Sequence, residues 1–161
     1  MNKLLSFLFI SVFFCALSCA AEGEKFSTNY GVNMKISIQV TSDSGSHKLS
    51  ATLADNSSAA AFYELLKKGA VAIKMRDYGS FEKVGPLGTT LPRNDTQITT
   101  TAGDIILYQG NQITIYYDTN SWNFTRLGKV VSTSSTTSIT QAELKKILGK
   151  GDVTAVFSVM E

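Results

Sequence analysis

The chain has 161 residues, of which 43% are hydrophobic, and its 15 basic and 13 acidic side chains give a net charge of +2. This length suits one ordinary domain with a full-sized core. The near balance of charge, without a stripe of Lys or Arg, argues against a nucleic-acid-binding protein. One His and two Cys leave no usual zinc ligand set, so we expect neither a metal nor a cofactor.

The first 20 residues have the order of a secretory signal peptide. Lys3 precedes an apolar run over residues 4–17, and small residues follow. A membrane-spanning helix needs about 20 apolar residues, so the sequence favours export over a retained membrane anchor. We therefore expect the protein in the cell envelope, in the periplasm or outside the cell.

Cys19 ends a short motif that has two interpretations. Residues 16–19, Ala-Leu-Ser-Cys, resemble a bacterial lipoprotein signal, in which the Cys becomes the lipidated first residue. Ordinary cleavage before Ala21 is the alternative. We favour lipidation, which would make Cys19 the protein's one attachment to a membrane. A flexible tether over residues 21–32 and a folded domain over 33–161 would follow.

Alternating apolar and polar residues, typical of half-buried strands, dominate the rest of the chain. They predict strands over 34–41, 49–54, 71–75, 97–101 and 153–159, in addition to three in a central segment, 103–131. Strands and helices do not alternate along the chain as they do in proteins with a parallel sheet, so the sequence indicates an antiparallel sheet. Because closure removes the exposed edges of an antiparallel sheet, we predict a mainly β fold, a closed antiparallel barrel of about eight strands.

Two short helices are predicted to cap this barrel. The first follows the potential N-caps at residues 55–58 and ends near Gly69. The second begins at Thr140, which can form a capping box with Glu143, and ends before Gly149.

Two stretches are predicted to be irregular. The polar run STSSTTS, residues 132–138, is interpreted as a mobile surface loop. The run 79–97 is long for a connection within one domain, which suggests that this loop has a function or is partly disordered.

The central segment contains two hairpin signals, which predict the faces of three strands. An even-numbered loop around Gly110-Asn111, and another around residues 118–121, would place Ile106 opposite Ile115 and pair the second strand with the third. One face would then carry Ile106, Tyr108, Ile113, Ile115, Tyr117, Trp122, Phe124 and Arg126. The other would carry Ile105, Leu107, Gln109, Gln112, Thr114, Tyr116, Asn123, Thr125 and Leu127.

The runs GDIILYQGNQITIYY, NSWNFTRLGK and RDYGSFEKVGPLGTTLP resemble the bacterial cyclophilin-like domain family. The resemblance covers residues 33–160. It implies an eight-stranded antiparallel barrel with a helix at each open end, in agreement with the strand count. Members of this family are largely uncharacterised and often exported.

The resemblance to prolyl isomerases is poorer at the level of activity. Cyclophilin-type isomerases use an Arg guanidinium to hydrogen-bond the prolyl nitrogen beside an apolar pocket, and their usual Arg-Phe-His segment is absent here. Arg126 is the best candidate for a catalytic guanidinium. Its alternative role is structural, as an Arg that stacks on aromatic rings and pairs with Glu82 or Asp104.

Two hypotheses for function follow. The first is a monomeric, non-catalytic module of the cell envelope that binds a peptide or small molecule beside the run 79–97. The second is a divergent prolyl isomerase centred on Arg126. The candidate binding residues are Tyr78, Phe81, Glu82, Tyr108, Gln109, Tyr117 and Trp122.

Overall fold

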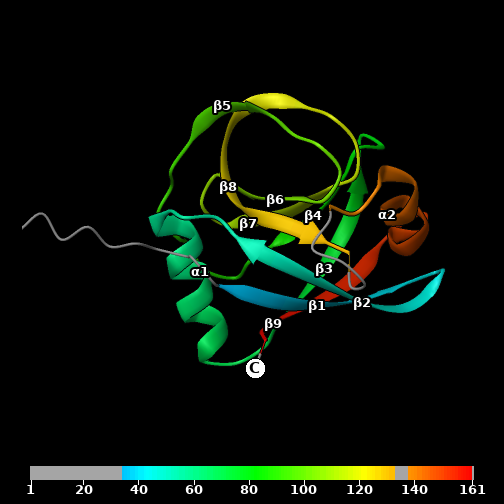
Figure 1. Ribbon diagram of the computed structural model, residues 1–161, viewed down its shortest axis with the longest axis horizontal. Coiled ribbons are helices and arrows are strands. Elements are labelled where there is room, and N and C mark those ends of the chain that lie inside the picture. Colours follow the sequence, from blue (N-terminus) through cyan, green and yellow to red (C-terminus); the bar gives the residue numbers. More distant parts are fainter. Residues whose placement is uncertain (1–33, 133–137, 161) are drawn as a thin grey trace, which may run out of the picture.

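A computed structural model describes residues 34–132 and 138–160 of the chain, which form nine strands and two helices (Figure 1). The strands are β1 (Lys35–Ser42), β2 (Gly45–Leu53), β3 (Val71–Tyr78), β4 (Glu82–Pro86), β5 (Thr96–Thr99), β6 (Asp104–Tyr108), β7 (Gln112–Tyr116), β8 (Ser121–Val131) and β9 (Val153–Val159). The helices are α1 (Ser57–Lys67) and α2 (Gln141–Leu148).

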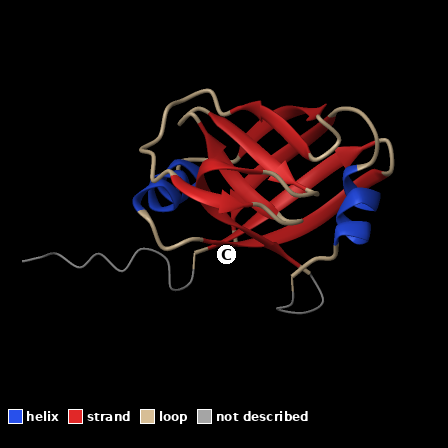
Figure 2. Cartoon of the chain, turned by 90° about the horizontal axis from the view of Figure 1, so that it is seen from above, coloured by secondary structure: helices blue, strands red, loops and turns tan. Residues whose placement is uncertain are grey.

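Eight of these strands form a closed antiparallel barrel in the order β2-β1-β9-β3-β4-β7-β6-β8, and pairing between β8 and β2 closes it. β5 is an additional strand that pairs with β8. The two helices lie at opposite ends of the barrel (Figure 2). The predicted fold class is therefore confirmed, with one strand more than the expected number.

Closure of the barrel depends on a glycine. Gly128 of β8 lies opposite Leu53 of β2, and a Cβ atom at Gly128 would lie 2.5 Å from the carbonyl oxygen of Thr52. Such a distance is shorter than any van der Waals contact, so only a residue without a side chain lets these two strands approach.

Both helices begin where capping predicts. The Asn56 side chain accepts a hydrogen bond from the Ala59 backbone N–H, and α1 ends at Lys67, with Lys68 as its C-cap one residue before Gly69. Thr140 and Glu143 form the predicted capping box of α2, and Gly149 follows as its C-cap. These contacts satisfy backbone N–H groups that a helix leaves without partners at its start.

The main core fills the barrel and extends under both helices. It contains the inward residues of β1, such as Ile36 and Ile38, and buried side chains of α1 and α2, such as Phe62 and Leu144. A second, smaller cluster of three buried residues, Ile106, Tyr116 and Phe124, lies apart from it.

The predicted register of the central segment is wrong by one residue. Ile105, not Ile106, lies opposite Ile115, because the loop between β6 and β7 has three residues, Gln109, Gly110 and Asn111. Gln109 and Gly110 both take positive φ angles, 51° and 79°, which tighten this turn. An odd-numbered loop reverses the faces of the following strand.

The consequence is an exchange of faces along β7. Ile113, Ile115 and Tyr117 belong to the main core, whereas Tyr116 belongs to the second cluster. The expected pairing of β7 with the next strand is also wrong, since β8 pairs with β6, and Arg126 lies opposite Ile106.

The run 79–97 is more ordered than predicted. It includes β4, which pairs with β3 on one side and β7 on the other, and the start of β5. Four of the five β4 residues are buried and lack the alternation of a half-exposed strand, which is why the pattern failed to show it.

Three predictions concern residues outside the described ranges: the signal peptide, the tether after it and the central part of the polar loop 132–138. Among the described residues, neither helix has the length and apolar character needed to cross a membrane.

Candidate functional site

A groove of about 380 Å³ lies on the outer face of the barrel. Strands β3, β4, β6, β7 and β8, the turn between β3 and β4 and the connection before β8 contribute side chains to it. Its lining consists of Arg76, Tyr78, Phe81, Glu82, Val84, Tyr108, Gln112, Tyr116, Asn120, Trp122 and Phe124. Six of these eleven residues are aromatic, so the groove offers mainly flat, apolar surface with a few polar groups.

The second cluster forms the aromatic wall of this groove. The rings of Phe81 and Tyr116 are stacked, with centroids 5.9 Å apart and an angle of 14° between their planes. Tyr116 also contacts Phe124 at 5.7 Å, and Phe124 contacts Tyr108 at 6.4 Å. Contacts of this kind hold the rings in fixed positions beyond what burial alone would do.

Two large side chains of the groove remain open to solvent. Tyr78 is 53% exposed and Trp122 is 61% exposed. An isolated exposed aromatic residue needs no explanation, but two that border the same aromatic groove are a feature of ligand-binding surfaces. Trp122 is also the sole tryptophan of the chain, so its fluorescence reports on this groove alone.

Glu82 is the acidic group of the groove and is only 7% exposed. Burial raises the pKa of its carboxyl above the ordinary value, and a hydrogen bond from the Tyr116 hydroxyl offsets this in part. Within the described part of the chain, its Oε2 atom is buried and has no hydrogen-bond partner.

Tyr116 lies between Glu82 and Asn120, the residue that precedes β8. Its hydroxyl accepts a hydrogen bond from the Asn120 side-chain amide at 3.5 Å. Burial and the neighbouring Glu82 raise the pKa of Tyr116, so this hydroxyl stays protonated and donates to the carboxyl.

Arg76 supplies the positive charge of the groove. Its guanidinium carbon lies 5.8 Å from the centre of the Tyr78 ring, a cation–π arrangement. Arg76 lies opposite Val84, two residues along β4 from Glu82, and its side chain is exposed at the rim.

Five of the predicted binding residues line this groove: Tyr78, Phe81, Glu82, Tyr108 and Trp122. Gln109 lies in the turn after β6, where its side-chain amide donates to the Tyr108 hydroxyl at 3.3 Å. Tyr117 lies elsewhere, because the register places it on the inner side of the barrel. Its contacts belong to another cluster.

Tyr117 belongs to a polar network at the end of the barrel near α2. Its hydroxyl donates to Asp77 at 2.6 Å, and the buried Lys83 ammonium pairs with the same carboxylate at 2.9 Å. Lys83 also donates to the backbone oxygens of Gly149 and Gly151. Burial acts to raise the pKa of Asp77, but the two donors outweigh it, and the pKa lies below its ordinary value.

The Lys83 network therefore has a structural explanation. All three donors of its ammonium are used, and they fix the turn between α2 and β9 to strand β4. An adjoining pocket is lined by surface lysines such as Lys145 and Lys146, yet none of the described residues that line it has a buried polar atom without a partner.

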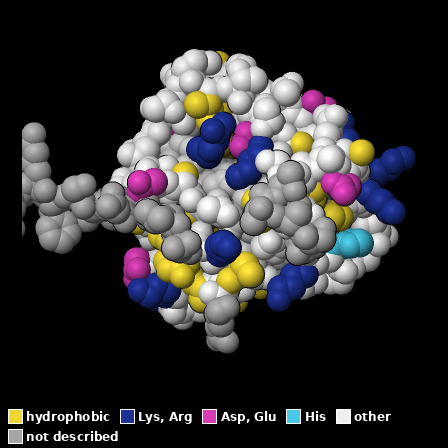
Figure 3. All heavy atoms as spheres, in the orientation of Figure 1, with side chains coloured by type: hydrophobic (Ala, Val, Ile, Leu, Met, Phe, Trp, Pro, Cys, Tyr) yellow, Lys and Arg dark blue, Asp and Glu magenta, His cyan; other side chains and the backbone are white. Residues whose placement is uncertain are grey.

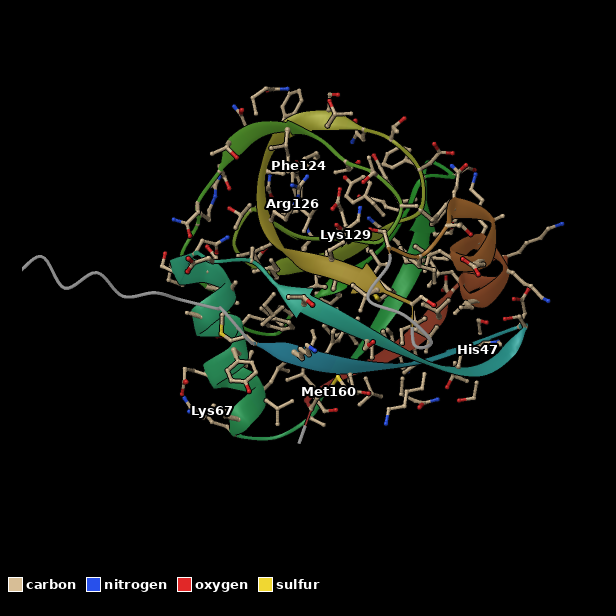
Figure 4. The ribbon with its side chains drawn as sticks, in the orientation of Figure 1. His47, Lys67, Phe124, Arg126, Lys129 and Met160 are labelled. Carbon is tan, nitrogen blue, oxygen red and sulfur yellow. The ribbon has the colours of Figure 1, made fainter. Side chains whose placement is uncertain are left out.

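Arg126 has the structural contacts that the sequence offered as its alternative role. Its guanidinium lies 3.4 Å from the carboxylate of Asp104, which is 2% exposed, and Lys129 pairs with the same carboxylate at 3.2 Å. Phe124, Arg126 and Lys129 follow one another along β8 (Figure 4). On the face of the molecule seen in Figure 3, Lys and Arg side chains gather near the centre, beside an acidic side chain.

The predicted binding residues did not include six of the groove residues, namely Arg76, Val84, Gln112, Tyr116, Asn120 and Phe124. The wrong loop length placed Tyr116 and Gln112 on the opposite face from Tyr108. Arg76 and Val84 were missed because the strand β4, and with it the partner of β3, was not predicted. The alternation around Met75 was the available signal for Arg76, since it predicts an outward side chain at that position.

Comparison with known proteins agrees with this architecture. The sequence profile described as the cyclophilin-like family matches residues 42–158 of the chain. The solution structure of the hypothetical protein AF2241 from Archaeoglobus fulgidus superposes with a TM-score of 0.51 at 14% sequence identity, over 80% of this chain and 97% of the other. That likeness concerns the fold alone. No curated protein matches the sequence.

Proposed function

Because the chain belongs to the cyclophilin-like family, we propose that its barrel is a non-catalytic binding module that holds a peptide or small molecule in the aromatic groove on its outer face. The observation that carries this proposal is the groove itself, where Tyr78 and Trp122 stand exposed above a fixed aromatic wall. Concave, mostly apolar sites with a few polar groups are the usual ligand sites of proteins.

The packing supports a preformed site. Phe81, Tyr116 and Phe124 contact one another through their rings, and Tyr116 is further held by the Asn120 amide. A ligand that enters the groove loses little free energy to rearrangement of the protein, because the wall is already ordered.

Tryptophan fluorescence tests this proposal directly. An acetylated and amidated tetrapeptide containing Phe and Pro, titrated into the folded domain, should change the emission of Trp122 in a saturable way. Phe81→Ala should weaken the binding by about tenfold or more, since a large ring contact is lost. Tyr63→Ala, a change of ring to methyl on α1, is the matched control and should bind like the wild type. Absence of any saturable change would count against the module.

A prolyl isomerase remains the second candidate, and one observation favours it. Arg76 brings a guanidinium to a groove with an aromatic wall, whereas Arg126 is engaged by Asp104 and is not part of the groove lining. If isomerisation occurs, Arg76 is the residue expected to hydrogen-bond the prolyl nitrogen. Isomerisation of a proline-containing test peptide should then be lost in Arg76→Ala and kept in Arg126→Ala. Equal rates with and without the wild-type protein would remove this candidate.

We also propose that the protein is exported and attached to the cell envelope through Cys19. The order of charged, apolar and small residues over 1–20 supports export. Mass spectrometry of the mature protein from cells tests it: a lipidated N-terminal Cys19 is expected, an N-terminal Ala21 would show ordinary cleavage, and an intact Met1 would contradict export.

A further inference from the structure

Glu82 and Asp104 are both almost fully buried, but they differ in the partners of their carboxyl groups. Asp104 pairs with Lys129 and Arg126 and accepts from the Thr101 backbone N–H. Among the described residues Glu82 forms no ion pair, and its Oε2 has no donor at all. A buried polar atom without a partner is rare and calls for an explanation, because its desolvation is not compensated.

The sheet geometry places this atom at the site. Glu82 lies opposite Tyr78 on one side and Tyr116 on the other, and all three line the groove. The hydroxyl oxygen of Thr114, two residues before Tyr116 on β7, is likewise buried without a partner in the described structure. Strands β4 and β7 thus leave two polar atoms unsatisfied in the sheet that forms the groove.

The surroundings of Glu82 suit a cation better than an anion or a purely apolar group. Aromatic faces carry negative partial charge and attract ammonium groups, and an adjacent carboxylate adds a charged acceptor. An anionic group at the same position would face Glu82 and the ring faces together. A purely apolar group would leave the Oε2 atom without a donor.

Arg76 is the one cation in the groove lining, and it lies opposite Val84 rather than opposite Glu82. It lies diagonally across the sheet from Glu82, and such neighbours are about 7–8 Å apart. Its exposed guanidinium rests over Tyr78 at the rim, where solvent and salt screen its charge.

We infer that the groove binds a primary ammonium group carried on an apolar body, with an N–H donated to Glu82 Oε2 and the body stacked on the rings of Phe81, Tyr116 and Phe124. This inference rests on the proposed binding function and names the ligand class of the same groove. A free amine and a lysine side chain of a peptide share this chemistry.

Matched ligands separate the ammonium group from the apolar body. 2-Phenylethylamine carries both, whereas 2-phenylethanol keeps the ring and replaces the ammonium by a hydroxyl. Binding is followed through the Trp122 indole N–H signal in NMR spectra of the folded domain. The amine should bind about tenfold or more tightly than the alcohol, as expected for a charge-assisted hydrogen bond in a buried site.

Glu82→Gln tests the role of the carboxylate, with Glu64→Gln on the exposed face of α1 as the matched control. We expect Glu82→Gln to abolish the preference for the amine while leaving the alcohol affinity within about twofold, and Glu64→Gln to change neither affinity. To distinguish the source of the ammonium, a capped peptide Phe-Lys-Phe is compared with its acetyl-lysine form. A preference for the unmodified peptide indicates a peptide lysine, and equal binding of the two indicates a free amine.

The outcomes separate this inference from the proposed function. Equal binding of amine and alcohol, unchanged in Glu82→Gln, would overturn the ammonium site but leave the apolar groove as a binding module. Failure of both ligands and of the capped tetrapeptide to perturb Trp122 would overturn both. An amine preference that persists in Glu82→Gln would also overturn the inference, since another group would then be the acceptor.

Discussion

Glu82 of β4 lies directly opposite Tyr116 of β7, and both side chains are buried in the outer groove rather than in the barrel core. The Tyr116 hydroxyl hydrogen-bonds the carboxyl, and burial nevertheless keeps the pKa of Glu82 above its ordinary value. The ionisable groups around it on the neighbouring strands are Arg76 and Tyr78 of β3 and Tyr116 itself. This pair makes the stability of the fold depend on pH.

Glu82→Gln is expected to stabilise the domain at neutral pH. A carboxyl whose pKa is raised by folding stabilises the native state fully below its unfolded pKa of about 4.3, and this contribution is lost as the pH rises through the folded pKa. The neutral amide avoids the loss. Thermal unfolding should therefore give Glu82→Gln a higher Tm than the wild type at pH 7 and a similar Tm below pH ~4. A lower Tm for the variant at pH 7 would contradict the assigned burial of an unpaired carboxyl.

Phe124→Ala is expected to destabilise the domain by about 3 kcal/mol, in the range for loss of a buried ring. Phe124 is almost completely buried and contacts both Tyr116 and Tyr108. Urea unfolding measures the change. Trp122→Phe on the same strand serves as the comparison and should change the free energy of unfolding little, because Trp122 is mostly exposed. A loss below about 1 kcal/mol for Phe124→Ala would mean that the second cluster is not packed as described.

Lys83→Met is expected to cost about 3–5 kcal/mol, as for a buried ion pair from which one partner is removed. The change removes the cation that pairs with Asp77, which keeps only the Tyr117 hydroxyl as a side-chain donor, and it removes the Lys83 hydrogen bonds to the Gly149 and Gly151 carbonyl oxygens. The exposed Lys74→Met on β3 is the control and should be close to neutral. Hydrogen exchange should also quicken in the turn between α2 and β9 if Lys83 holds it. Equal stability of the two variants would refute that role.

Gly128→Val is expected to destabilise the barrel at its closure by about 3 kcal/mol or more. The new side chain would meet the Thr52 carbonyl oxygen, which lies 2.5 Å from an ideal Cβ position. Circular dichroism during urea unfolding measures the loss. A variant as stable as the wild type would show that β2 and β8 do not approach in solution as they do in this structure.

The alternation of apolar and polar residues indicated a barrel of antiparallel strands, and the capping residues indicated both helices. Strand β1, for example, buries Ile36, Ile38 and Val40 with the period of two that its sequence shows. The capping residues Asn56 and Thr140 mark the helix starts because they carry their own local hydrogen bonds. Such features depend on neighbours in sequence, so a single chain reveals them.

The groove was only partly predictable, because its geometry depends on one turn and one strand. Tyr116 and Tyr117 are adjacent in sequence and have the same side chain. The length of the loop between β6 and β7 decides which of them faces the groove. Gln109 adopts a left-handed backbone that a non-glycine residue seldom takes, so a three-residue loop was not the first choice. β4 is buried on both sides and has no alternation to reveal it.

The most direct test of the account is to map a bound ligand on the domain by two-dimensional NMR. Upon titration with 2-phenylethylamine, we expect the largest shifts at the Trp122 indole N–H and at the backbone amides of Phe81, Glu82 and Tyr116. Amides around Lys145 and Gly151 in the pocket beside α2 should stay unchanged. Shifts concentrated in that pocket, with Trp122 unaffected, would contradict the assignment of the aromatic groove as the binding site.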